Sequence, residues 1–126
     1  MDLSKFTERS RGFIQAAQTI AARESHQRLT PEHLLKALMD DDQGLASNLI
    51  AAAGGNAARV TEALNLSLGK LPQVSGDAAQ IYLDNTTAKV LAEAEGLAKK
   101  AGDSFVPVER VLMALSMVKS AAKDAL

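Results

Sequence analysis

The chain has 126 residues, of which 47% are apolar, and it contains no cysteine. This length and apolar content suffice for one domain with a hydrophobic core, and the lack of cysteine excludes a disulfide framework, a thiolate nucleophile and a cysteine zinc site. With 14 basic and 15 acidic residues, the net charge of −1 argues against a nucleic-acid-binding surface. The N-terminus resembles no signal peptide and no stretch approaches the ~20 apolar residues of a membrane span, so we expect a cytoplasmic protein.

The first half of the chain predicts helices from its apolar spacing and its caps. Apolar residues that include Phe6, Ile14 and Ile20 recur at helical spacing and predict a helix within residues 4–24. Thr30-Pro31 then forms a strong helix start, with a hydroxyl cap followed by proline at the first helical position. We expect this second helix to end before the three acids at 40–42, because carboxylates are unfavourable at the negative end of a helix dipole.

The rest of the chain predicts further helices separated by glycine- or proline-containing segments. Residues 70–77, KLPQVSGD, contain Pro72 and Gly76 and have no helical period, so we interpret them as a connector. Residues 78–83 have no clear assignment, and one of Asp84, Asn85 and Thr86 is expected to cap the helix that follows. The remaining predicted helices cover 45–53, 57–69, 84–101 and 107–118, with the start of one more in 119–126.

Residues 90–115 repeat residues 13–38 when the chain is displaced by 77 positions. Under this offset Ala17 matches Ala94, Glu32 matches Glu109 and Leu38 matches Leu115. Such a repeat indicates one supersecondary unit used twice. We therefore predict an all-α domain of two pseudo-two-fold-related helical repeats: repeat one over about 4–69, a connector over 70–83 and a truncated repeat two over about 84–126. Repeat two lacks a counterpart of the last helix, so either the chain is a piece of a longer protein or the fold closes without that helix, and an open end should leave apolar surface exposed.

The motifs of several enzyme classes are absent from the sequence. It holds no phosphate-binding GxxxxGK[ST] loop and no GxGxxG dinucleotide motif. His26 and His33 are seven residues apart without an HExxH motif or a third ligand, so we expect them on a loop and on a helix surface rather than at a metal. The acidic run before Gly44 fails the EF-hand spacing, and no spacing nominates a catalytic triad. We expect a binding module with no catalytic residue, no metal and no cofactor of its own.

Four segments carry a resemblance to a known family. The segments resemble the repeated signature of the Clp N-terminal repeat domain family, and along the chain they follow the order found in that family. They are TPEHLLKAL, NAARVTEALN-x-x-LGKLPQV, AKKAGDSFV and VPVERVLMAL. The connector LPQVSG is most similar to that of the stress-response disaggregases of the heat-shock-100 class. The resemblance covers essentially the whole chain.

The resemblance implies a function that depends on the rest of a longer protein. Members of the family carry an all-α N-terminal domain of about eight helices, joined to two AAA+ modules that form a hexamer and use ATP and magnesium. The N-terminal domain of the disaggregases binds unfolded or aggregated polypeptide and passes it to the motor, and other domains work with DnaK-type chaperones. The alternative is an adaptor-docking domain of a Clp protease-associated unfoldase, and an unrelated helical enzyme or regulator is a third hypothesis.

The resemblance also assigns candidate substrate-binding residues, each of which has a structural alternative. Thr7 is equally suited to cap a helix, Asp103 to satisfy loop amides and Glu109 to face a helix dipole. Leu91 and Leu97 suit the core, whereas Phe105 in a short loop is hard to bury and should be exposed. A guanidinium at position 110, often apolar in the family, would favour acidic or aromatic substrates at the groove edge. The assigned residues are Thr7, Leu91, Leu97, Asp103, Phe105, Val106, Glu109 and Arg110.

Overall fold

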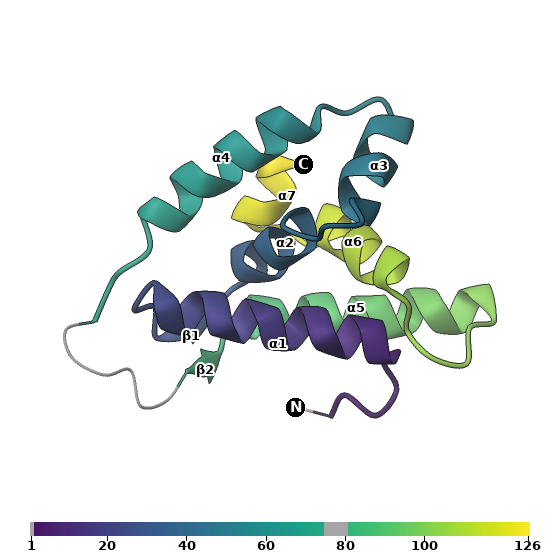
Figure 1. Ribbon diagram of the computed structural model, residues 1–126. Coiled ribbons are helices and arrows are strands. Elements are labelled where there is room, and N and C mark those ends of the chain that lie inside the picture. The colour runs from purple at the N-terminus through teal and green to yellow at the C-terminus, as the bar shows by residue number, and fades with distance from the viewer. Residues whose placement is uncertain (1, 75–80) are drawn as a thin grey trace.

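The computed structural model describes residues 2–74 and 81–126, and within them the chain is mostly helical (Figure 1). The helices are α1 (Glu8–Arg23), α2 (Pro31–Met39), α3 (Leu45–Ala52), α4 (Ala57–Gly69), α5 (Asn85–Ala101), α6 (Val108–Met117) and α7 (Ala121–Ala125). In Figure 1, α2 and α6 occupy the middle, with α1 and α5 along one side and α3 and α4 on the other. The all-α prediction is confirmed, and no helix of the described part is long and apolar enough to cross a membrane.

The helices begin and end where local chemistry predicts. The Thr7 hydroxyl accepts from the Ser10 amide at 3.1 Å and starts α1, and the Asp84 carboxylate accepts from the Thr86 amide at 3.0 Å and starts α5. These side chains satisfy amides that the first turn of a helix leaves without a partner. The second helix ends at Met39, directly before the acidic run, as expected. Residues 4–6 are not part of α1, because Phe6 forms an isolated bridge with Val106 instead.

Helix α2 supplies the centre of the core. Seven of its residues are buried, including Leu34 and Leu35, which are almost completely inaccessible. Helix α1 packs on α2, and α5 packs on α6 in the same way, so each repeat contains a helical hairpin that packs against the other repeat. This arrangement agrees with the repeat detected in the sequence.

Two short strands were not predicted. Strand β1 (Arg28–Leu29) pairs in parallel with β2 (Tyr82–Leu83), with Arg28 opposite Tyr82 and Leu29 opposite Leu83. A strand of two residues is too short to show the alternation by which strands are found in a sequence. Of the predicted connector, residues 75–80 lie outside the described part of the chain.

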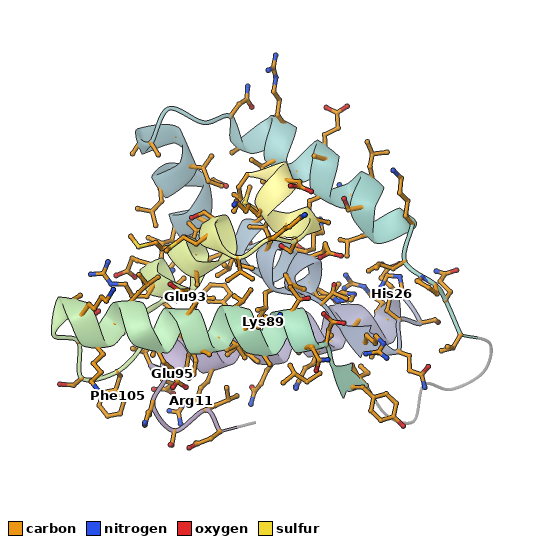
Figure 2. All side chains as sticks on the ribbon, turned by 180° about the vertical axis from the view of Figure 1, so that it is seen from behind. Arg11, His26, Lys89, Glu93, Glu95 and Phe105 are labelled. Atoms are coloured by element: carbon orange, nitrogen blue, oxygen red, sulfur yellow. The ribbon has the colours of Figure 1, made fainter. Side chains whose placement is uncertain are left out.

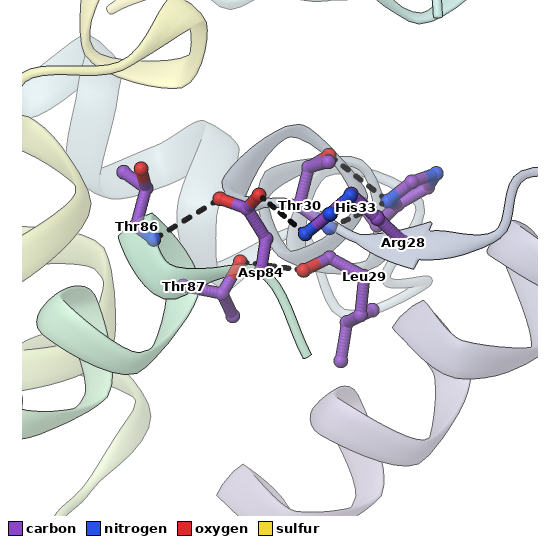
Figure 3. Close-up of polar contacts among 7 residues, drawn as sticks. All are labelled: Arg28, Leu29, Thr30, His33, Asp84, Thr86 and Thr87. Carbon is purple, nitrogen blue, oxygen red and sulfur yellow. Dashed lines mark hydrogen bonds and ion pairs between the residues drawn. The ribbon is translucent and has the colours of Figure 1, made fainter. Parts of the chain in front are cut away.

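The two repeats are joined by a pair of equivalent junctions, each centred on a carbonyl that accepts two hydrogen bonds. In the first junction, the Leu29 carbonyl accepts from the Thr87 hydroxyl at 2.7 Å (Figure 3) and from the Asp84 amide at 3.1 Å. In the second, the Val106 carbonyl accepts from the Thr7 amide at 3.0 Å and from the Ser10 hydroxyl at 2.9 Å. The same 77-residue offset relates the partners, because it carries Leu29, Thr7 and Ser10 onto Val106, Asp84 and Thr87. Each long helix therefore begins against the loop of the other repeat.

His26 lies in a loop and His33 on a helix, as expected, but the expected exposure of His33 on the helix surface was wrong. His26 and His33 are 4% and 0% exposed, and His26 Nδ1 lies 2.8 Å from His33 Nε2. The helical period places His33 on α2, but α2 is buried on nearly all sides and has no free surface at this position. Burial of an imidazole is tolerated when its nitrogens have hydrogen-bond partners, as both nitrogens of His33 and Nδ1 of His26 do here.

The first junction yields a test of the fold. Replacing Thr87→Val keeps the shape of the buried side chain but removes the donor to the Leu29 carbonyl, so the free energy of unfolding should fall by about 1 kcal/mol. Urea denaturation measures this change. The matched control is Thr19→Val, since Thr19 is exposed and bonds only to Gln15 of its own helix, and its effect should stay within about 0.5 kcal/mol. Equal effects of the two substitutions would contradict the role given to the junction.

Candidate functional site

The candidate site lies at the second junction, where the loop 102–107 passes between the end of α5 and the segment before α1. Helix α5 ends because Gly102 takes a left-handed conformation with φ of 80°, which glycine adopts without steric cost. The Asp103 amide then donates to the Ala98 carbonyl at 2.9 Å, and the Val106 amide donates to the Lys5 carbonyl at 2.7 Å. The backbone of the loop is thus held on both sides of Phe105.

Phe105 projects from this fixed loop into solvent. Its side chain is 56% exposed, as predicted for a large aromatic residue in a short loop. Figure 2 shows the ring below the C-terminal end of α5, on the same side of that helix as Glu95. An exposed aromatic side chain on a rigid loop offers apolar area at small entropic cost when it is covered.

A pocket of about 540 Å³ opens beside Phe105. Its apolar part comes from Phe105 and from small residues of α5, among them Ala92 and Gly96, and its charged side chains are Lys5, Lys99, Glu95 and Asp103. Two cations and two anions give this edge no dominant sign. The full lining comprises Lys5, Ala92, Glu95, Gly96, Ala98, Lys99, Gly102, Asp103, Ser104, Phe105 and Val106.

The polar residues at the site stabilise the loop through contacts with one another. Thr7 caps α1, and Ser10 of the same turn donates to the Val106 carbonyl. Asp103 accepts from Arg110 Nε at 3.2 Å, and both side chains are about 30% exposed. A partly exposed ion pair of this kind contributes at most about 1 kcal/mol, so its main effect is to orient the two side chains.

The structure distributes the predicted site residues over three environments. Thr7, Asp103, Phe105 and Arg110 surround the second junction. Leu91 and Val106 are 5% and 3% exposed and pack in the core, as the partly buried Leu97 does at its edge. Glu109 is exposed and lines a different pocket. A contact of each of these residues with polypeptide stays a prediction.

That other pocket is the feature that residue-by-residue reasoning missed. It has a volume of about 400 Å³ and lies between α3 and α6, with Leu49, Ile50, Leu112 and Met113 in its lining. Met113 and Leu126 line this pocket and are exposed, which agrees with the expectation that repeat two leaves apolar surface uncovered. The unequal length of the repeats was the signal in the sequence, but only the packing of α3 on this side shows where the surface lies.

The chemistry available at these surfaces is that of apolar burial. Within residues 2–74 and 81–126, no group of three or more histidine, cysteine, aspartate or glutamate side chains could hold a metal ion. The two pockets instead combine exposed apolar side chains with a few charges at the edge.

Comparison with known proteins defines the family. The Clp repeat (R) N-terminal domain family matches residues 5–126. The chain belongs to this family. It is 55% identical over 122 residues to the chaperone protein ClpB of Rhizobium meliloti (strain 1021) and 56% identical over 121 residues to that of Mesorhizobium japonicum. These matches cover 97% and 96% of the chain but only 14% of each relative.

A solved structure agrees with the Clp repeat fold. The crystal structure of the Hsp104 N-terminal domain from Candida albicans superposes with a TM-score of 0.86 over 97% of this chain and 79% of that one. The identity between the two is 23%, so this likeness concerns the fold alone. The resemblance of the sequence segments to the Clp N-terminal domains is confirmed.

Two glycines at the site provide a matched pair of substitutions. Gly102→Ala should lower the free energy of unfolding by about 1 kcal/mol, because alanine is strained at φ of 80° although its methyl group would meet no atom within 4 Å. Gly96→Ala also meets nothing within 4 Å but lies inside α5, so it should raise stability by about 0.5–1 kcal/mol. Thermal unfolding of both variants measures the difference, and stabilisation by Gly102→Ala would rule out the left-handed turn.

Proposed function

We propose that the chain is the substrate-binding N-terminal domain of an ATP-driven disaggregase, and that the pocket beside Phe105 holds segments of unfolded or aggregated polypeptide. The observation that carries the proposal is the exposure of Phe105 over a pocket of about 540 Å³, on a loop fixed at both ends. The close relatives that are named chaperone ClpB support it.

The shape of the pocket suits a non-native chain. Ala92 and Gly96 present little side-chain bulk, so an extended backbone can approach α5 while one of its apolar side chains covers Phe105. Burial of apolar area is non-directional and contributes about 25 cal/mol per Å². Such a surface selects exposed apolar segments without reading a particular sequence.

The charges at the pocket favour a broad range of clients. The pocket has no net charge, because Lys5 and Lys99 are balanced by Glu95 and Asp103. The Arg110 side chain pairs with Asp103 and does not line the pocket, which weakens the preference for acidic or aromatic clients that its position suggests. Segments of either charge can therefore bind.

Weak binding at each pocket is consistent with transfer to a motor. A small apolar contact with a flexible peptide, which loses entropy on binding, gives a Kd on the order of 10 μM to millimolar. In the proposed whole protein, two AAA+ modules per chain use ATP and magnesium and assemble as a cytoplasmic hexamer that works with DnaK-type chaperones. Six pockets on one ring would raise the affinity for an aggregate by about 10²–10⁴-fold.

Phe105 supplies the test of this function. Phe105→Ala should weaken binding of reduced, carboxymethylated α-lactalbumin, a permanently unfolded protein, by about 1–2 kcal/mol, or roughly five- to thirtyfold in Kd. Leu66→Ala is the matched control, because Leu66 is 64% exposed on α4 and does not line the pocket. Fluorescence anisotropy measures both affinities, and the control should bind as the unmodified chain does.

Amide chemical shifts locate the binding surface independently. Addition of the same unfolded protein should perturb the amides of residues 102–106 and of the exposed face of α5. Perturbations confined to the pocket between α3 and α6, or tight binding of one folded partner without any unfolded client, would overturn the proposal.

A further inference from the structure

The buried His26–His33 pair is held in one protonation state by its surroundings. The backbone amide of Thr30 lies 2.9 Å from His33 Nδ1 and can only donate, so this nitrogen accepts. The proton of the neutral His33 ring is therefore on Nε2, which donates to His26 Nδ1 at 2.8 Å. His26 Nδ1 accepts in turn, and both rings are neutral.

An added proton costs this arrangement a hydrogen bond. A proton on His33 Nδ1 would displace the bond that the Thr30 amide donates to this nitrogen and could be accepted only by the Thr30 hydroxyl at 3.0 Å, and a proton on His26 Nδ1 would face the Nε2–H of His33. Burial, and to a smaller extent the proximity of His26, lowers the pKa of His33 to about 4. The folded geometry therefore excludes a proton that a free imidazole accepts near pH 6.5.

The charged groups around the pair do not offset this exclusion. Three cations, Arg23, Arg28 and Lys36, and one acid, Glu24, line the surface pockets beside His26. Each cation has an acidic partner: Glu24 pairs with Arg23 at 3.8 Å, Asp84 with Arg28 at 3.8 Å and Asp40 with Lys36 at 3.1 Å. The groups nearest the pair therefore carry no excess of negative charge that would hold a further proton. The segment 71–74 and the end of α4 contribute only uncharged residues to these pockets.

The pair controls a loop that carries the first junction. The loop 24–30 accepts backbone hydrogen bonds from three amides across the molecule, those of Val74 to Ser25, Tyr82 to Gln27 and Asp84 to Leu29. His26 lies inside this loop, and His33 anchors it to α2. The His26–His33 contact is therefore the side-chain link between α2 and the segment that accepts these three backbone bonds.

The second junction contains the counterpart of this pair. The 77-residue offset carries His26 onto Asp103 and His33 onto Arg110, and these residues are also in direct contact, at 3.2 Å. There the contact is an ion pair between the Asp103 carboxylate and the Arg110 guanidinium, and it contains no imidazole, the side chain whose unperturbed pKa lies nearest to neutral pH. The two junctions thus share one geometry but differ in their response to protons.

We propose that the His26–His33 pair is an acid-sensitive latch on the first junction, which mild acid opens while the second junction stays closed by Asp103 and Arg110. The direction follows from linkage: the open form binds a proton that the closed form excludes, so opening is favoured as pH falls below 6.5. Glu32, buried on α2, has the opposite effect, because burial raises its pKa and acid then favours the closed form.

Amide hydrogen exchange, corrected for the intrinsic pH dependence of exchange, tests the latch on the 126-residue chain. Between pH 7.5 and pH 5.0, the Val74, Tyr82 and Asp84 amides should lose about thirtyfold in protection, since one proton changes the opening equilibrium by about tenfold per pH unit below 6.5. The Thr7 and Val106 amides of the second junction should keep their protection. Parallel loss at both junctions, or no loss at the first, would overturn the proposal.

A matched pair of variants separates titration from packing. His33→Gln introduces a residue that is common at this position of a capping box, and its side-chain carbonyl can accept from the Thr30 amide. Because glutamine does not titrate, the substitution should abolish the pH dependence at the first junction. Arg110→Gln, at the equivalent position of repeat two, should leave that dependence intact.

Ring nitrogen chemical shifts at pH 7.5 give a readout independent of folding: both rings should carry their proton on Nε2, and a proton on His33 Nδ1 would contradict the latch.

Discussion

Two backbone carbonyls, those of Leu29 and Val106, hold the repeats of this domain together. Each accepts an amide and a hydroxyl from the opposite repeat, which satisfies both lone pairs of a buried oxygen. A buried carbonyl that loses its partners costs about 1–3 kcal/mol, so the start of each long helix is tied to the loop of the other repeat. The pseudo-two-fold arrangement follows from this reciprocal requirement.

The same constraint explains why the candidate site is rigid and exposed. The Val106 carbonyl and amide are both engaged, and Asp103 is bonded to the last turn of α5, so the loop cannot move to bury Phe105. The ring therefore stays over a pocket whose other apolar surface comes from small residues of α5. A binding surface of this kind arises where the fold places an aromatic side chain that the core cannot reach.

The two repeats have kept their junctions while changing the chemistry that closes them. Positions seven residues apart hold two neutral imidazoles in repeat one and a carboxylate with a guanidinium in repeat two. The fold requires a polar contact at this point but not a particular one. One junction became buried and sensitive to protons, whereas the other is partly exposed and lies beside the proposed substrate pocket.

The sequence by itself determined the helices, their caps and the repeat, because capping, helix-breaking residues and apolar spacing act over a few neighbouring positions. It also predicted that Phe105 is exposed, since a large ring in a short loop has little to pack against. The sequence also favoured a core position for Leu91, but only the tertiary structure decided that Val106 is buried, that Glu109 faces another pocket and that His26 and His33 form a buried pair. The environment of each of these residues depends on which helix of the other repeat covers it. Contacts between residues far apart in the chain do not produce the regular apolar spacing from which helices are predicted.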